Sequence, residues 1–363
     1  MKLPRIIMLA TLLLTAPAAA QLQITPPVAT PGASAEKTKD KPKATPHTIT
    51  KKEAPPAPKP SASPKPSASP KPAPAATVIP APPTDNPNVD LVYGAYQRGQ
   101  YKTAFELATA RAQAGDPKAM TMLGELYSNA MGIRRDYAKA LEWYKRAADA
   151  GDREAMFALA MLRISGRGGP VDKGEAVKLM ASAAKLGEPK AAYNLALLYL
   201  DGQTLPQDVK RSAELLRQAA DAGLPEAQYA LATFYKEGTG VPKDPERAVR
   251  LLQAASLTDN VDAEVEYAIA LFNGTGTPKN QPAAVALLRK ASRQGSAIAQ
   301  NRLAWVLING MGTSVDKVEG FKWHLVAKTA GKGDPELDKQ LSDLPAEDRA
   351  KAEAAARKWL GTK

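Results

Sequence analysis

Residues 119–151 read AMTMLGELYSNAMGIRRDYAKALEWYKRAADAG, and this stretch returns every 36 residues along the chain. One column holds alanine in every copy: Ala119, Ala155, Ala191, Ala227, Ala263 and Ala299. A second alanine column follows the same step: Ala147, Ala183, Ala219, Ala255, Ala291 and Ala327. A fixed period of this length predicts a solenoid in which similar units stack on one another.

Each 36-residue unit predicts two helices joined by a short loop. In the first unit, small and apolar residues such as Ala119 and Leu123 share one face of a helix over residues 117–129. After a loop that contains glycine, Asp136 occupies the N-cap position of a second helix, and Ala140 begins the apolar stripe of that helix. The pattern therefore predicts an all-α chain of helix-turn-helix repeats.

The repeat region has its own boundaries. We predict that the solenoid occupies residues 88–343, with a degenerate first unit followed by six full units from Ala119. Residues 344–363 are predicted to form a C-terminal capping helix, because a terminal helix needs a charged outer face and this segment supplies one.

Residues 1–20 have the layout of a secretory signal peptide. Lys2 and Arg5 precede a short apolar run, and the small residues Ala18 to Ala20 follow it. The run is about half of the roughly 20 residues that a membrane-spanning helix needs. Cleavage is therefore favoured over an uncleaved membrane anchor. We expect export to a bacterial periplasm, with secretion as the alternative and no integral membrane segment after signal cleavage.

Residues 21–87 are rich in proline, alanine, lysine and serine, with the near-repeat SASPKPSASPKPAP over residues 61–74. Proline removes backbone donors and large apolar side chains are few, so this segment cannot build a core. We predict a disordered, partly polyproline-II spacer. A solvated tether is the favoured role, and contact of its lysines with anionic lipid or cell wall is the alternative.

Composition excludes several kinds of site. The chain has no cysteine, so disulfides, thiolate metal sites and thiol nucleophiles are impossible. Its two histidines, His47 and His324, are too far apart in the sequence to suggest a zinc site. The net charge of +12 is spread along the chain, so nucleic acid is not an expected partner. We predict no metal and no cofactor.

Two recurring patterns imitate chemical motifs. Aspartate returns with the repeat at Asp136, Asp172, Asp208, Asp244 and Asp316. Successive units lie about 10 Å apart, which is too far for two carboxylates to share a catalytic site, so we assign these residues to helix capping. Gly-x-Gly loops, as at residues 238–240, follow helices rather than strands, so they are predicted to end helices and not to bind phosphate. His324 is expected to be a core residue hydrogen-bonded to backbone. We predict no catalytic residue and no enzyme.

These columns resemble the Sel1-like repeat, a relative of the tetratricopeptide repeat. The best matches to the family pattern are AQYALATFYKEGTGVPKD at residues 227–244 and ALEWYKRAADAG at residues 140–151. Local departures are Arg163, Thr204, Asp259 and Asn280. The resemblance implies a right-handed α/α solenoid whose concave face is lined by the first helices. It also implies an adaptor or scaffold, and exported bacterial members often act in envelope signalling, polysaccharide export or host contact.

By analogy with tetratricopeptide helices, three columns of the first helices are predicted to line the concave groove. The residues expected to bind a partner there are Phe157, Tyr193, Leu197, Leu200, Tyr229, Thr233, Ile269, Phe272 and Trp305. Contiguous exposed apolar surface marks partner sites, and tyrosine and tryptophan are frequent anchors. The alternative is that Tyr193 and Tyr229 only pack between units, since they occupy a standard position of the family.

We predict a non-catalytic periplasmic scaffold that holds a protein or peptide segment in this groove, in envelope regulation. The alternative is a module that binds cell-wall glycan or exopolysaccharide, in which Tyr193, Tyr229 and Trp305 stack on sugar rings. An enzyme would need a convergent polar cluster, which the sequence does not suggest.

Overall fold

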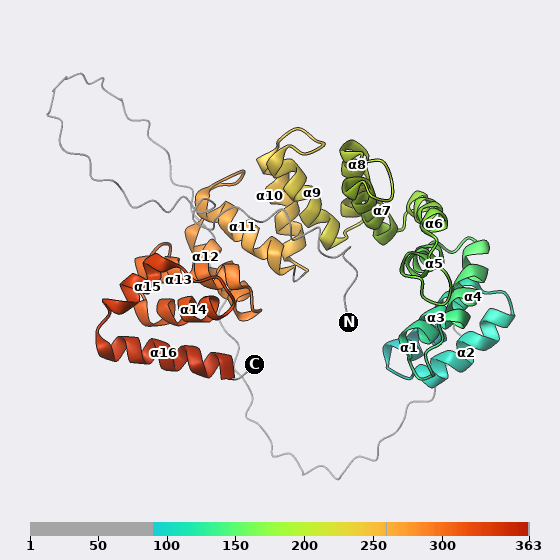
Figure 1. The fold of residues 1–363 in the computed structure, drawn as a ribbon, viewed down its shortest axis with the longest axis horizontal. Coiled ribbons are helices and arrows are strands. Elements are labelled where there is room, and N and C mark those ends of the chain that lie inside the picture. The colour runs from blue at the N-terminus through green and yellow to red at the C-terminus, as the bar shows by residue number, and fades with distance from the viewer. Residues whose placement is uncertain (1–89, 259, 362–363) are drawn as a thin grey trace, which may run out of the picture. The chain divides into compact units, whose positions relative to one another are not determined.

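A computed structural model describes residues 90–258 and 260–361, and all regular secondary structure in these residues is helical. The predicted signal peptide and proline-rich spacer lie outside the described residues. Figure 1 shows that the described helices follow one another in antiparallel pairs, each pair stacked against the next. The prediction of an all-α helix-pair solenoid is therefore confirmed.

Six successive helix pairs correspond to the six repeats, and we number them units 1–6. The first helices are α3 (Pro117–Asn129), α5 (Arg153–Ser165), α7 (Pro189–Asp201), α9 (Pro225–Glu237), α11 (Val261–Asn273) and α13 (Ala297–Asn309). The second helices are α4 (Tyr137–Asp149), α6 (Lys173–Lys185), α8 (Val209–Asp221), α10 (Pro245–Ser256), α12 (Gln281–Arg293) and α14 (Lys317–Thr329). The pair α1 (Leu91–Gln97) and α2 (Tyr101–Gln113) precedes them, and α15 (Pro335–Ser342) and α16 (Ala346–Gly361) follow.

Short polar residues begin the second helices, as the sequence predicts. The side chains of Asp136, Asp172, Asp208, Asp244 and Asp316 each accept a backbone N–H three residues further on, at 2.9–3.0 Å. Asn280 replaces aspartate in unit 5 and accepts the N–H of Ala283 at 3.1 Å. An N-cap needs only a short side chain that can accept a hydrogen bond, so this substitution keeps the helix start.

Residues in the left-handed conformation end the first helices. Glycine occupies this position in five units, for example Gly166 with φ 65° and Gly238 with φ 81°. In unit 1 the position holds Ala130, which adopts φ 59° and is the only non-glycine residue with positive φ in the described part of the chain. In unit 3 the second loop glycine is replaced by Thr204, which does not have positive φ. The loop glycines therefore terminate helices, as predicted.

A second loop glycine, present in every unit except unit 3, lets the loop approach the preceding helix pair. Gly276 has φ 69°, and a Cβ placed there would collide with the carbonyl of Pro245 at the start of α10. This loop therefore packs backbone against backbone, which fixes how unit 5 sits on unit 4.

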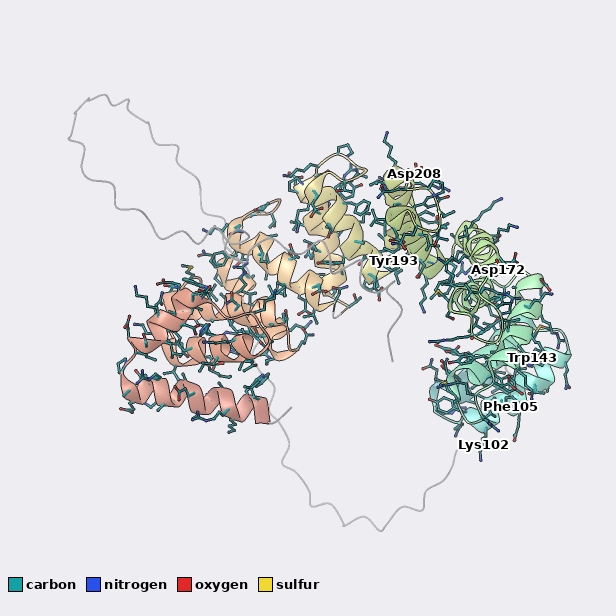
Figure 2. The ribbon with its side chains drawn as sticks, in the orientation of Figure 1. Lys102, Phe105, Trp143, Asp172, Tyr193 and Asp208 are labelled. Atoms are coloured by element: carbon teal, nitrogen blue, oxygen red, sulfur yellow. The ribbon has the colours of Figure 1, made fainter. Side chains whose placement is uncertain are left out.

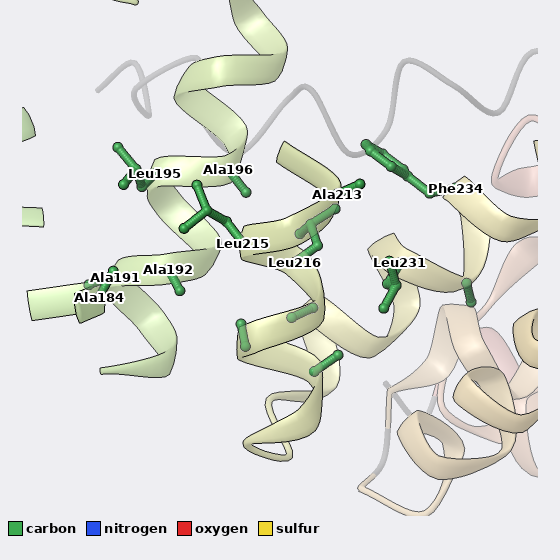
Figure 3. Close-up of a cluster of buried hydrophobic side chains, with 14 of the residues drawn as sticks. Ala184, Ala191, Ala192, Leu195, Ala196, Ala213, Leu215, Leu216, Leu231 and Phe234 are labelled. Carbon is green, nitrogen blue, oxygen red and sulfur yellow. The ribbon is translucent and has the colours of Figure 1, made fainter. Parts of the chain in front are cut away.

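Alanine columns form the centre of the solenoid. The six alanines of the Ala119 column and the six of the Ala147 column are at most 3% exposed. Leucines such as Leu195, Leu216 and Leu231 fill the space between them, as Figure 3 shows for units 3 and 4. Small side chains let neighbouring helices approach closely, and the leucines then fill the remaining volume.

The C-terminal helices cover the last repeat. Helix α16 packs along α14, where the rings of Trp323 and Trp359 meet edge to face with centroids 5.0 Å apart. Lys322 Nζ lies 4.3 Å from the ring centroid of Trp323. Such aromatic and cation–π contacts stabilise a terminal helix that has only one neighbouring layer.

Candidate functional site

Seven of the nine predicted groove residues form a half-buried surface on the first helices. We call this surface the first-helix face: Phe157, Tyr193, Leu197, Leu200, Tyr229, Thr233 and Trp305. Ile269 and Phe272 instead belong to the hydrophobic core around α11, α12 and α13, with 8% and 6% of their surface exposed. The structure therefore excludes these two residues from the candidate surface, because a side chain packed in the core has little area left for a partner.

Tyr193 and Tyr229 combine the two roles that the sequence left open. Each ring rests against the hydrophobic core that extends from unit 2 to the start of unit 5, yet each remains partly exposed; Figure 2 labels Tyr193 on α7. Neither phenol hydroxyl has a hydrogen-bond partner among the described residues. Burial, with a smaller effect of Glu226, raises the pKa of Tyr193. Both hydroxyls therefore stay protonated at neutral pH and can donate to an incoming group.

Negative charge surrounds Tyr229. Burial and then the carboxylates of Glu266, Asp262 and Glu237 raise the pKa of Tyr229 above its ordinary range. Partial burial and the neighbouring Glu266 raise the pKa of Asp262. Lys236 Nζ lies 3.1 Å from Glu266 Oε2 and neutralises that carboxylate. Glu237 and Asp262 are exposed and form no ion pair within the described residues.

A pocket of about 240 Å³ opens near the N-terminal end of the solenoid, between α1, α3 and the start of α5. Tyr93, Tyr96 and Met122 contribute to its lining, and Tyr96 Oη donates to Glu125 at 2.8 Å. Sequence reasoning missed this pocket because α1 belongs to the degenerate unit, whose packing does not follow the repeat. The closely spaced aromatic residues of α1 were the available signal.

The C-terminal end of the first-helix face is held by polar contacts. Trp305 Nε1 donates to Asp334 Oδ2 at 2.9 Å, and Asn301 Nδ2 donates to the carbonyl of Lys332 at 3.3 Å. Arg302 is 2% exposed, and its Nε and Nη2 have no hydrogen-bond partner among the described residues. Burial lowers the pKa of Arg302, although Glu266 and Asp334 oppose this shift. Trp305 is therefore a structural anchor of the loop at residues 331–334 as well as part of the face.

Sequence comparison matches the Sel1 repeat model at residues 117–152, 153–188, 189–224, 225–257, 261–296 and 297–332. The chain belongs to the Sel1 repeat family. The matches coincide with units 1–6, and only residues 258–260 fall between two of them, where Asp259 replaces the glycine that ends other units.

Two solved structures show the same Sel1 repeat arrangement. One is c5321, a protective antigen of uropathogenic Escherichia coli strains, with 26% identity and a TM-score of 0.64 over 74% of this chain. This chain spans 59% of the length of that antigen. The other is a Sel1 repeat protein from Oxalobacter formigenes, with 27% identity, a TM-score of 0.59, and coverage of 67% of this chain and 100% of its own. No curated protein matches the chain.

His324 of the last Sel1 repeat is fully buried, as expected, but its predicted partner is wrong. Its Nε2 lies 2.8 Å from Asp338 Oδ1 on α15, not against a backbone group. Lys328 Nζ contacts the same carboxylate oxygen at 2.8 Å. These hydrogen bonds from Lys328 and His324 lower the pKa of Asp338. The three residues fasten α15 to the last repeat, and sequence periodicity could not reveal this because α15 lies outside the repeat.

Two further findings concern the Sel1 repeats and their flanking helices. Among the described residues, no three histidine, aspartate or glutamate side chains gather in a way that could hold a metal ion. Across residues 90–258 and 260–361, no helix combines the length and the apolar character needed to cross a membrane.

Proposed function

We propose that this Sel1 repeat protein is a non-catalytic scaffold that holds an extended segment of a partner protein on its first-helix face. The observation that carries the proposal is the row of partly exposed aromatic and aliphatic side chains on α5, α7 and α9. Phe157, Tyr193 and Tyr229 occupy equivalent positions in consecutive units, so they present a repeated anchor to one chain. Aromatic anchors surrounded by smaller contacts are typical of protein interfaces.

The proposal includes a periplasmic location. Residues 1–20 carry the charge, apolar run and small residues of a signal peptide. The relative from uropathogenic Escherichia coli is a protective antigen, a role that suits an exported protein. Cell fractionation of a bacterium that makes the full chain tests the location. Chain in the periplasmic fraction, shortened at the N-terminus, is expected; full-length chain in the cytoplasm contradicts it.

Capture of a partner from periplasmic extract tests the binding surface. The variant Leu197→Glu places a charge in the centre of the first-helix face, and Tyr193→Ala with Tyr229→Ala removes both tyrosine anchors. Leu186→Glu is the matched control, because Leu186 is an exposed leucine in the loop after α6. We expect the control to retain the partner and the face variants to lose it, with circular dichroism unchanged. Retention by every variant would contradict the proposed surface.

Binding of cell-wall glycan or exopolysaccharide is the second candidate function. The partly exposed rings of Tyr193 and Tyr229 favour it, because aromatic rings stack on sugars as well as on peptide side chains. Sedimentation with isolated peptidoglycan distinguishes the two functions. Tyrosine-dependent sedimentation without capture of any protein would support the glycan function.

A further inference from the structure

Helices α7, α9 and α11 carry an unusual combination of tyrosine and carboxylate side chains. We call it the tyrosine–carboxylate patch: Tyr193, Glu226, Tyr229, Glu237 and Asp262. Tyr193 and Tyr229 are equivalent residues of units 3 and 4, and Glu226 and Asp262 are equivalent residues of units 4 and 5. Glu226 lies three residues before Tyr229 on α9, so both side chains share one side of that helix.

The carboxylates of the patch are not neutralised within the described residues. Glu226, Glu237 and Asp262 are exposed and take part in no ion pair there. Lys236 adjoins Glu237 on α9, and Lys190 occupies on α7 the position that Glu226 occupies on α9. Lys236 is paired with Glu266 at 3.1 Å, and Lys190 on α7 is exposed without an ion pair to any of these acids. The patch therefore keeps an excess of negative charge.

In the equivalent region of units 1 and 2, the carboxylates do form ion pairs. Lys118 Nζ lies 2.9 Å from Asp152 and 3.2 Å from Glu154, and Arg153 Nε lies 3.8 Å from Glu188. The acids at the N-terminal ends of α5 and α7 thus form ion pairs with bases of the neighbouring first helices. Carboxylates without an ion pair beside partly exposed tyrosines are a local property of units 3–5 and do not follow from the repeat.

We infer that the segment held on this part of the first-helix face is a basic, extended peptide whose lysine or arginine side chains contact the tyrosine–carboxylate patch. The inference rests on the proposed function and specifies its partner. Carboxylates attract ammonium and guanidinium groups, and tyrosine rings bind the same cations through their faces. An acidic peptide or an acidic polysaccharide would instead be repelled.

The spacing of the units also predicts how far apart the basic residues of the partner segment should be. Packed helix layers are typically about 10 Å apart, and an extended chain advances about 3.3 Å per residue. Basic residues three positions apart therefore match the step from Tyr193 to Tyr229. Partner segments with lysine at every third residue should bind better than segments with the same lysines at every second residue.

Fluorescence anisotropy with dye-labelled peptides tests the inference on the full chain. The probes are four copies of Ala-Lys-Pro, the same peptide with glutamine or with glutamate in place of lysine, and a lysine peptide with a two-residue spacing. We expect the lysine peptide to bind roughly tenfold more tightly than the glutamine peptide, as three exposed ion pairs would give. The glutamate peptide should not bind, and the preference should weaken with salt.

Matched variants localise the effect. The combination Glu226→Gln, Glu237→Gln and Asp262→Asn should abolish the preference for lysine over glutamine. The control combination Glu142→Gln, Asp221→Asn and Glu246→Gln removes three exposed, unpaired carboxylates of the second helices and should leave it unchanged. Circular dichroism of each variant verifies folding.

The other outcomes have defined meanings. Equal binding of lysine and glutamine peptides, lost on Tyr193→Ala with Tyr229→Ala, would overturn the basic partner while the proposed peptide-binding face stands. No binding of any peptide, together with no partner captured from extract, would overturn both. Tighter binding of a glucosamine oligomer than of the lysine peptide, dependent on the same carboxylates, would overturn the peptide in favour of a cationic glycan.

Discussion

Ala130 is a residue in a conformation that its side chain disfavours. It ends α3 with φ 59°, whereas glycine occupies the equivalent position in the other five units. An L-residue with a Cβ pays about 1–2 kcal/mol in the left-handed region, because Cβ crowds the carbonyl oxygen. Unit 1 therefore stores local strain that the other units avoid.

Replacing Ala130 with glycine should stabilise the chain. We expect Ala130→Gly to raise the free energy of unfolding of unit 1 by about 1 kcal/mol, measured by urea denaturation. Ala150→Gly is the control, because Ala150 ends α4 with φ −84° and gains nothing from glycine. A gain for Ala150→Gly equal to that for Ala130→Gly would contradict the role of strain.

Gly124 and Tyr144 form a matched pair of small and large residues. A Cβ on Gly124 would lie 2.6 Å from the ring of Tyr144. The other units carry alanine at the position of Gly124 and Met, Leu or His at that of Tyr144. In unit 1 the smaller residue at position 124 thus compensates for the larger residue at position 144, so the combined side-chain volume stays similar to that of the other units.

The pair predicts a compensating double substitution. Gly124→Ala should destabilise the chain by about 1–3 kcal/mol through overpacking. Adding Tyr144→Leu recreates the pair found in units 3–5, Ala with Leu, and should recover most of that loss. A double-mutant cycle by urea denaturation measures the coupling. A double variant as unstable as the sum of the singles would show that the two side chains do not compete for space.

At the scale of elements, α15 is attached to the last repeat by charge as well as by burial. Leu337 and Leu341 supply the apolar contacts, and Asp338 accepts from Lys328 and His324. Since these bonds lower the pKa of Asp338, the folded state prefers the ionised carboxylate. Its stabilisation is fully present above the unfolded pKa near 3.9 and is lost as the pH falls through the lower folded value.

Asp338→Asn should therefore destabilise the C-terminal helices at neutral pH. We expect a loss on the order of 1 kcal/mol, since the carboxylate is about one-third exposed and partly screened. The melting temperatures of variant and wild type should converge as the pH falls below 4. Asp343→Asn, an exposed acid without an ion pair in the described structure, is the control. A difference that persists unchanged in acid would contradict the role of the charge.

At the scale of the whole described solenoid, most packing joins elements that are close in the sequence. Helices α1 to α14 each pack on their neighbours along the chain, and α16 packs on α14. Stability in such an array is a sum of unit and interface terms, so damage at one end need not spread. Trp359 tests this property because it joins the last helix to Trp323.

Trp359→Ala should loosen the C-terminal end selectively. The ring is half-buried, so we expect a local loss of roughly 2 kcal/mol, below that of a fully buried tryptophan. Hydrogen exchange should accelerate in α14 and α16 and remain unchanged in α3 to α8. Uniform acceleration along the chain would show that the solenoid unfolds as a single cooperative unit.

The sequence by itself determined the features that depend on near neighbours. The 36-residue period located the six helix pairs, the aspartates marked the helix starts, and the loop glycines marked the helix ends. Caps and left-handed turns involve residues within a few positions of one another, so the local pattern contains their physical cause.

Only the tertiary structure decided which residues of a repeated column are accessible. Leu197 and Leu200 remain partly exposed, whereas Ile269 and Phe272, which occupy the same two columns, are buried. The partner of His324 and the pocket beside α1 likewise depend on helices outside the repeat. Burial is set by neighbours brought together through folding, and equivalent positions in a repeat acquire different neighbours towards the ends of the array.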